Sequence, residues 1–181
     1  NNMNILKKIL IAIAMLIAAV LLAALFIKKD YAVEKQIVIN KPKQTVFDYI
    51  KLLKNQDNYS KWAMMDPNMT KTYRGTDGTV GFVSAWDSKQ ENVGAGEKKK
   101  KKIIEGERID LALRFTKPFE AHDDAYLVTE AVNDSTTNVK WGFTGAFPYP
   151  MNVMNLFMDM EKAVGGDLQT GLENLKKVLE K

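Results

Sequence analysis

His122 is the only histidine of the 181-residue chain and lies in the phrase Glu120-Ala121-His122-Asp123-Asp124. That spacing matches no zinc motif, and a chain without cysteine would need several carboxylates to hold the metal. Every Ser-His-Asp scheme would have to use this one histidine. Residues 75–78, Gly-Thr-Asp-Gly, are typical of a turn and not of a phosphate-binding loop. We therefore expect no metal, no cofactor and no catalytic triad.

Acid–base catalysis stays open as an alternative, because it needs only a titratable group inside a pocket with a perturbed pKa. The residues that could serve, provided that they point inward, are His122, Asp110, Glu130 and Tyr126.

Lys98 to Lys102 form an unbroken run of five lysines. The net charge of +4 comes from this run, since the other side chains number 21 basic against 22 acidic. With only three arginines as well, we expect no nucleic-acid binding. Three interpretations stay open: a solvated edge or hairpin, attraction to anionic lipid headgroups, or a cavity lysine that meets an acidic ligand. In a regular strand at least two of these lysines would face the core.

Aromatic and methionine side chains form the other candidate site. Ligand cavities are lined mainly by apolar and aromatic groups with a few polar ones. Taken singly, each such residue is more often plain core. We expect the cavity lining to include Trp62, Phe82, Trp86, Phe115, Phe119, Trp141, Phe143, Phe157 and Met158, with Arg114 and Tyr126 as polar groups that orient a ligand.

The elements that must position these residues follow from hydrophobic periodicity. We expect a first strand at 31–40, a helix after Pro42 with an apolar face, and a connection at 55–67. Turn residues then separate strands at 70–73, 81–86, 97–104, 108–115, 125–132 and 137–144. An apolar stripe predicts a helix over 152–180, with Gly165-Gly166 marking a kink or a close approach to the sheet.

This order predicts an α+β fold in which a curved antiparallel sheet grips a long C-terminal helix. If the sheet wraps the helix incompletely, a cavity remains between the two. A core filled completely would favour a partner-binding module instead.

Residues 9–27 are nineteen consecutive apolar residues bounded by lysines. As a helix they would span roughly 28 Å, close to the hydrocarbon core of a bilayer. We expect a transmembrane anchor at 1–29 and one domain at 30–181. The rivals are a signal peptide and a buried core helix. Lysines on both sides leave the membrane side of the domain open.

Several phrases also carry a family resemblance across residues 31 to 181. They are Val38-Ile39-Asn40-Lys41-Pro42 before Val46-Phe47, Glu107-Arg108-Ile109, Phe115-Thr116-Lys117-Pro118-Phe119, Trp141-Gly142-Phe143, Leu156-Phe157-Met158-Asp159-Met160 and residues 165–176. In order and spacing the chain resembles the SRPBCC superfamily of START-like helix-grip domains, of the polyketide cyclase/dehydratase type. It looks like the bacterial subgroup with an N-terminal membrane helix. The lysine run departs from the family, which usually alternates polar and apolar residues there.

The resemblance implies a seven-stranded antiparallel sheet around the C-terminal helix, with a hydrophobic ligand cavity between them. Members bind lipids, sterols, polyketides or hormones, and some are enzymes, so the fold does not fix the activity. We expect a single-pass protein, in a bacterial cytoplasmic membrane, that binds a hydrophobic small molecule or lipid. The alternative is a cyclase- or dehydratase-like enzyme acting in the same cavity.

Overall fold

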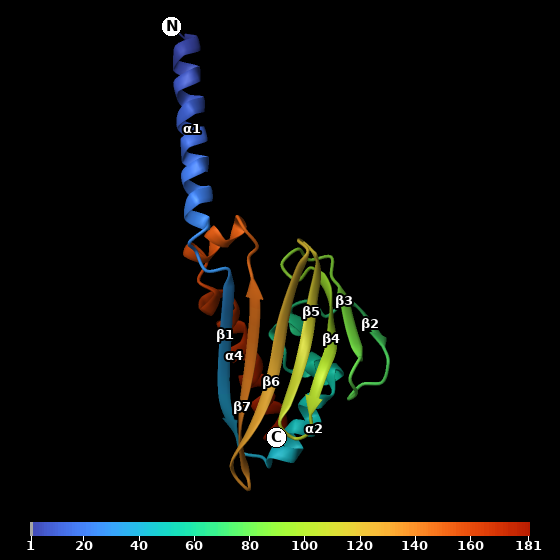
Figure 1. Cartoon of the computed structure of the whole chain (residues 1–181). Coiled ribbons are helices and arrows are strands. Elements are labelled where there is room, and N and C mark those ends of the chain that lie inside the picture. The colour runs from blue at the N-terminus through green and yellow to red at the C-terminus, as the bar shows by residue number, and fades with distance from the viewer. Residues whose placement is uncertain (1) are drawn as a thin grey trace.

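A computed structural model describes residues 2–181 and shows a helix that projects from an α+β domain (Figure 1). The first half comprises α1 (Asn2–Ala24), β1 (Asp30–Ile39), α2 (Lys43–Lys51), the 3-10 helix η1 (Leu53–Asn58), α3 (Lys61–Met65), β2 (Thr70–Arg74) and β3 (Val83–Asp87). The second half comprises β4 (Ala95–Ile104), β5 (Arg108–Lys117), β6 (Ala121–Asn133), β7 (Thr136–Ala146), the 3-10 helix η2 (Met151–Leu156), the π-helix η3 (Glu161–Gly165) and α4 (Gly166–Leu179).

The seven strands form one antiparallel sheet in the order β1-β7-β6-β5-β4-β3-β2. Alternate residues of each strand face α4 and the core, as Ile109, Leu111 and Leu113 do on β5. Figure 1 shows α4 lying behind the sheet, and the strands that it contacts most are β1 and β7. The predicted curved sheet with a C-terminal helix is therefore confirmed.

The first strand and α2 also follow the sequence pattern. Val46, Phe47 and Ile50 on α2 are completely buried, together with Leu53 just after the helix. Their three- and four-residue spacing puts them on one side of the helix, facing the sheet. With these side chains α2 covers the end of the hydrophobic core that lies farthest from α1 (Figure 1).

The predicted helix over 152–180 is broken into three parts, which corrects the prediction. Residues 157–159 are not helical, and the regular helix α4 begins only at Gly166. The cause is tertiary, because η2 packs against the end of α1 instead of continuing along the sheet. Gly165 does approach the sheet closely, since a Cβ there would lie 3.2 Å from Val33 Cγ1.

Side chains from the η2 region satisfy the free carbonyls at the end of α1. Asn152 Nδ2 donates to the carbonyls of Ala24 at 2.7 Å and Ile27 at 2.8 Å, and Asn155 Nδ2 donates to that of Lys28 at 2.9 Å. The last carbonyls of a helix have no partner within it, so these bonds replace water there. They fix α1 to the domain.

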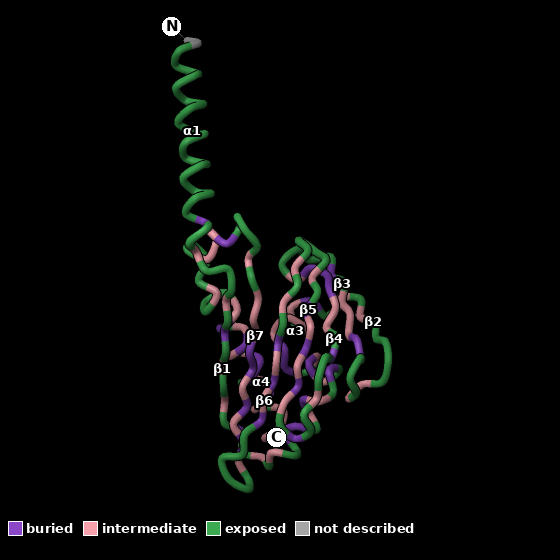
Figure 2. The backbone as a smooth tube through the Cα atoms, in the orientation of Figure 1, coloured by how far each residue is buried: buried purple, intermediate pink, exposed green. Residues whose placement is uncertain are grey.

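Residues 4–23 of α1 are exposed, and only Ala24 at the junction with the domain is buried (Figure 2). Residues Asn4–Ala24 have a mean hydropathy of 2.6, and none of the most apolar window is buried. By length and composition the helix could cross a membrane. The alternative of a buried core helix is excluded by this exposure.

Two glycines of α4 give a matched test of how closely the helix approaches the sheet. A Cβ on Gly171 would lie 2.7 Å from Trp141 Cζ3, whereas one on Gly166 would meet nothing within 4 Å. We expect Gly171→Ala to lower the free energy of unfolding by about 1–3 kcal/mol through overpacking. Gly166→Ala should raise it by about 0.5–1 kcal/mol through helix propensity. Urea denaturation followed by tryptophan emission measures both, and equal effects would contradict the close approach.

Candidate functional site

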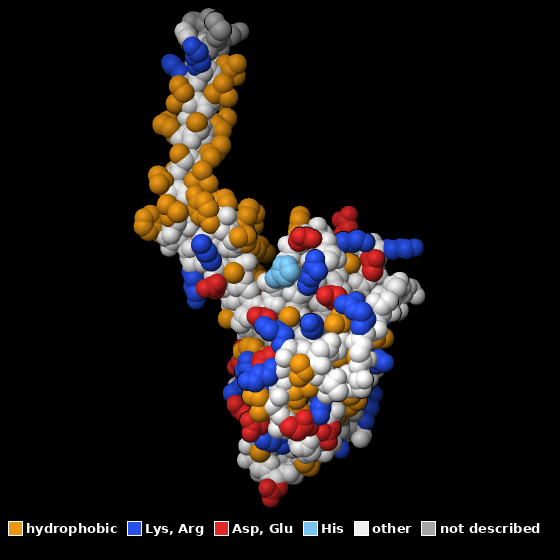
Figure 3. Space-filling view, turned by 45° about the vertical axis from the view of Figure 1, so that its right-hand side comes forward, with side chains coloured by type: hydrophobic (Ala, Val, Ile, Leu, Met, Phe, Trp, Pro, Cys, Tyr) orange, Lys and Arg blue, Asp and Glu red, His pale blue; other side chains and the backbone are white. Residues whose placement is uncertain are grey.

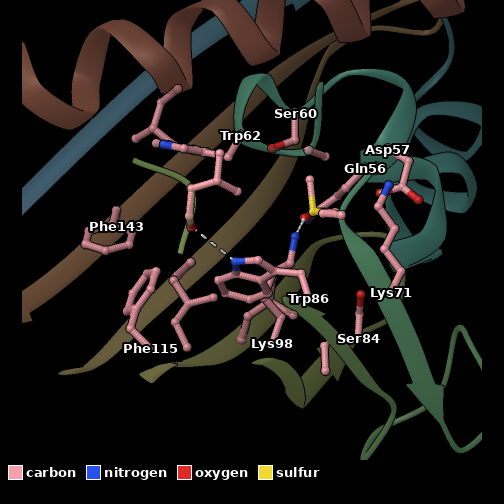
Figure 4. A pocket seen from close by; sticks show the side chains of 18 of the residues that line it. Gln56, Asp57, Ser60, Trp62, Lys71, Ser84, Trp86, Lys98, Phe115 and Phe143 are labelled. Carbon is pink, nitrogen blue, oxygen red and sulfur yellow. Dashed lines mark hydrogen bonds and ion pairs between the residues drawn. The ribbon is translucent and has the colours of Figure 1, made fainter. Parts of the chain in front are cut away.

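A cavity of about 210 Å³ lies between the concave face of the sheet and the elements η1, α3, η3 and α4 (Figure 4). All three tryptophans of the chain line it. The lining residues that the argument uses are Gln56, Asp57, Trp62, Lys71, Trp86, Lys98, Phe115, Ala125, Trp141 and Phe143.

One end of the cavity is aromatic. The rings of Trp86 and Phe115 meet edge to face with centroids 5.8 Å apart, and those of Trp62 and Trp141 do so at 6.3 Å. Phe143 lies beside Phe115 in Figure 4. The strands deliver these side chains because Phe115, Trp141 and Phe143 occupy inward-facing positions of β5 and β7. This end can contact a flat or branched apolar group.

The opposite end carries charge. Lys98 Nζ donates to Gln56 Oε1 at 2.6 Å, and Lys71 Nζ forms an ion pair with Asp57 Oδ1 at 2.9 Å. The Lys98 ammonium also lies 5.8 Å from the centroid of the Trp86 ring. Gln56 and Asp57 come from η1, so a short 3-10 helix supplies the acceptors for lysines of β2 and β4.

Burial lowers the pKa of Lys98 to about 8, because the ammonium has lost much of its water. The Asp57 carboxylate raises this pKa and Lys71 lowers it further, but both effects are smaller than that of burial. Lys98 is therefore a partly desolvated cation inside the protein.

The lysine run alternates across β4 until a bulge. Lys98 and Lys100 face inward, Lys99 and Lys101 face outward, and the register shift between Lys100 and Lys102 leaves Lys102 exposed. At Lys98 and Lys99 the strand β4 pairs with both β3 and β5, so the edge interpretation is wrong for these two residues. Lys101 and Lys102 lie beyond the pairing with β3, exposed in the hairpin of β4 and β5, as the hairpin interpretation expects. The expectation that two lysines face the interior is confirmed.

Lys100 has a structural place outside the cavity. Its side chain is fully buried, donates to the Lys51 carbonyl and lies 3.5 Å from Asp77 Oδ1. Asp77 in turn accepts the backbone N–H groups of Leu53 and Lys54 at 2.9 and 3.0 Å. Burial lowers the pKa of Lys100 as well. These contacts tie the start of η1 to the sheet.

The structure brings Trp62, Trp86, Phe115, Trp141 and Phe143 of the expected set to the cavity. Phe82 belongs to the core instead, where it is 1% exposed and stacks on Tyr73.

The remaining candidates lie elsewhere, which corrects the expected lining. Phe119 and Phe157 are each 79% exposed, and Met158 borders a shallow groove at the base of α1. Phe119 lies beyond the end of β5, and the other two lie in the break before η3.

Arg114 and Tyr126 lie on the outer face of the sheet, one residue out of step with the inward positions of β5 and β6. The Tyr126 hydroxyl donates to Glu34 there.

The four residues of the catalytic alternative are likewise absent from the cavity lining. His122 is exposed, Asp110 pairs with Arg108 at 2.8 Å and Glu130 pairs with Lys140 at 2.8 Å. Tyr126 is on the outer face as described. In the part of the chain that the structure describes, no cluster of three or more metal-ligating side chains occurs.

Sequence reasoning missed Gln56, Asp57 and Lys71. Nothing in the local sequence around these three residues indicates a ligand site, because η1 and β2 come together only in the folded domain. Lys98 did carry a signal, since a strand through five lysines must turn some of them inward.

A seven-stranded sheet that folds around a C-terminal helix and leaves an aromatic cavity defines a ligand-binding domain of the helix-grip class. Residues 31–180 match the family model described as "Polyketide cyclase / dehydrase and lipid transport", and the chain belongs to this family. No curated protein matches its sequence.

Solved structures share the fold at low sequence identity. A protein from Chromobacterium violaceum is 13% identical with a TM-score of 0.59, over 83% of this chain and 97% of that one. Norcoclaurine synthase from Thalictrum flavum in complex with dopamine and hydroxybenzaldehyde is 7% identical with a TM-score of 0.57, over 83% and 86%. The Aha1 dimer from Colwellia psychrerythraea is 14% identical with a TM-score of 0.56, over 83% and 96%. These likenesses establish the fold alone.

Lys98 should lower the stability of the free protein. Its pKa is about 8 in the fold against the usual 10.5, so the unfolded chain binds more protons between these values. The free energy of unfolding therefore increases as the pH rises from about 8 to 10.5. Below pH 8 the protein bears the full cost of burying the charged ammonium. We expect Lys98→Met to be about 1–2 kcal/mol more stable than the native chain at pH 7, with the difference shrinking toward pH 10.5.

Lys99→Met, on the outer face of the same strand, is the matched control and should change stability little. Thermal unfolding of the three proteins at several pH values measures this. If Lys98→Met is less stable at pH 7 than Lys99→Met, burial of the Lys98 ammonium does not destabilise the fold as we expect.

Proposed function

We propose that this chain is a membrane-tethered domain that binds a hydrophobic small molecule or lipid between its sheet and α4. The observation that carries the proposal is the cavity, about 210 Å³ in volume, with its aromatic end and few polar groups. A ligand there would bind chiefly by removing apolar surface from water, at about 25 cal/mol per Å². The family supports a ligand-binding role of this kind.

The volume limits the ligand. An engineered apolar cavity of about 150 Å³ holds benzene, and drug-sized pockets run from about 300 to 1,000 Å³. A cavity of about 210 Å³ suits one ring with a short chain, or the end of a longer chain. A whole two-tailed lipid would need the cavity to expand.

The membrane part of the proposal rests on the continuity of apolar surface between α1 and the domain. Figure 3 shows hydrophobic side chains along α1 and around its base. We give the name collar to six of the most exposed apolar residues at that end of the domain; they are Leu25, Phe26, Phe119, Met151, Leu156 and Phe157. A bilayer would cover both the helix and the collar. We propose a bacterial cytoplasmic membrane as its location, which is what the family resemblance of the sequence implies.

The cavity lies near the collar end of the sheet. Asp30, the first residue of β1, pairs with Ala146, and Phe143 is three residues from there along β7. At the rise of a strand this is about 10 Å. A ligand leaving the membrane would therefore have a short path to the aromatic end.

Filling the cavity should abolish ligand retention. Ala125 lines the cavity, whereas Ala112 occupies the outer face of β5, so Ala125→Leu and Ala112→Leu add the same atoms to opposite faces. We expect the full chain, purified in detergent and extracted for mass spectrometry, to carry at least tenfold less of any co-purifying compound in Ala125→Leu. Ala112→Leu should retain the native amount. Equal retention in both variants would count against the cavity as the binding site.

The collar can be tested because the chain has no cysteine, so that a single one can be labelled. Phe157→Cys places a nitrobenzoxadiazole label in the collar, and Val132→Cys places one at the opposite end of the sheet, where that residue is 57% exposed. In vesicles containing brominated phosphatidylcholine we expect the first label to be quenched at least twofold more strongly. The same quenching at both sites would refute contact between the collar and lipid.

A further inference from the structure

The charged lining of the cavity is unbalanced toward the positive. It consists of Asp57, Lys71 and Lys98, and the first two neutralise each other in their 2.9 Å ion pair. Lys98 is left facing a neutral acceptor, Gln56 Oε1. An ammonium has three N–H donors, and within residues 2–181 this one makes a single hydrogen bond. The cavity thus holds a cation with spare donors.

A second donor lies next to the first. Gln56 is 1% exposed, and its Nε2 makes no hydrogen bond of normal geometry among the residues that the structure describes, although the buried Tyr59 hydroxyl lies beside this side chain. Since Gln56 Oε1 accepts the bond from Lys98, the unpaired amide nitrogen belongs to the group that the ammonium already touches. Buried donors without acceptors are costly, so an oxygen that enters beside Lys98 would relieve both groups.

The polar residues of η1 and β2 and the apolar residues of β5 and β7 lie on different sides of the cavity, with Lys98 between them. Figure 4 shows Phe115 and Phe143 on one side, Gln56, Asp57 and Lys71 on the other, and Lys98 with Trp86 between them. A ligand that matches this lining has an apolar body and an acidic oxygen at one end. The other strands and helices that border the cavity, β5, β6, β7, η3 and α4, contribute apolar side chains to it.

We propose that the cavity selects small amphipathic acids, with the ligand carboxylate bound by Lys98 and Gln56 and the apolar body packed among Trp86, Phe115 and Phe143. This inference rests on the proposed function and names its ligand class. The charges that face Lys98 are Asp57 on η1 and Lys71 on β2. Asp57 and Lys71 form an ion pair with each other, so Lys98 has no carboxylate partner of its own. A ligand carboxylate could therefore bind the Lys98 ammonium without displacing Asp57.

The binding should depend on pH in a defined direction. A carboxylate needs the protonated form of Lys98, whose pKa in the free protein is about 8. Affinity for the acid should therefore be constant up to about pH 7.5 and fall toward tenfold per unit well above pH 8. A neutral ligand of the same shape should show no such fall.

The experiment uses the full chain in nanodiscs of phosphatidylcholine, with empty nanodiscs as the blank. Three probes share one body and differ in head group: 3-phenylpropanoate, 3-phenylpropan-1-ol and 3-phenylpropylamine. Binding is followed by tryptophan emission, because every tryptophan lines the cavity. At pH 7 we expect the carboxylate to bind at least tenfold more tightly than the alcohol, and the amine most weakly.

Two variants separate the charge of Lys98 from its titration. Lys98→Met should lose the preference for the acid and, between pH 6 and 9, bind the alcohol at least as tightly as the acid, because the carboxylate would be buried without a cation. Lys98→Arg should keep the preference for the acid and hold it beyond pH 9, because a guanidinium does not titrate there. Cooperative thermal unfolding of both variants, with Lys98→Met unfolding at or above the native midpoint, shows that the comparison is made on folded protein.

The outcomes distinguish the two proposals. If the alcohol binds as tightly as the acid in the native chain, or if Lys98→Met keeps the preference, the acid-selective site is overturned while the apolar cavity function stands. If none of the three probes binds, and no compound co-purifies with the chain, the cavity function fails and the acid-selective site fails with it.

Discussion

The indole of Trp141 lies where the sheet, α4 and the segment from η1 to α3 meet, and the arrangement of the domain depends on this contact. Gly171 lets the α4 backbone come against one side of the ring. Tyr59 and Trp62 meet it edge to face, at centroid distances of 5.7 and 6.3 Å. Because aromatic pairs favour this geometry, the ring holds three layers at fixed separations. It also forms part of the cavity wall, so the packing that stabilises the fold sets the shape of the space left open.

Within that frame, β4 carries two inward lysines with opposite consequences. Lys100 is matched by the Lys51 carbonyl and by Asp77, so it joins η1 to the sheet. Lys98 faces one neutral amide oxygen, and its lowered pKa reports the cost of holding a cation there. A methionine at position 98 would fill the same space without that cost. Such a local conflict is characteristic of a binding site, where stability is exchanged for recognition.

Local periodicity accounts for what could be predicted. The strands and α2 were accessible from sequence because side-chain direction repeats every two residues in a strand and about every 3.6 in a helix. Arg114 directly follows the inward-facing Leu113 on β5, and Tyr126 directly follows the inward-facing Ala125 on β6. The two-residue repeat of a strand therefore already predicts that Arg114 and Tyr126 lie on the outer face of the sheet. The failures needed tertiary information. An apolar stripe cannot reveal that Asn152 leaves the helix to bind the end of α1, nor can the composition of β4 reveal the bulge that exposes Lys102. Gln56, Asp57 and Lys71 become neighbours only when η1 folds over the sheet.

The hydrogen bonds from Asn152 and Asn155 to the end of α1 have a mechanical consequence. A flexible linker would let the domain swivel about the helix, and each encounter with a membrane-borne molecule would have to wait for a suitable angle. Here the amides hold the backbone on both sides of the join, so helix and sheet turn as one body. Under the proposed function, the orientational entropy of aiming the cavity at the membrane would be lost once, during folding, and not again at each binding event. In a bilayer, the domain would then need only to diffuse in the membrane plane and to rotate about the membrane normal in order to meet its ligand.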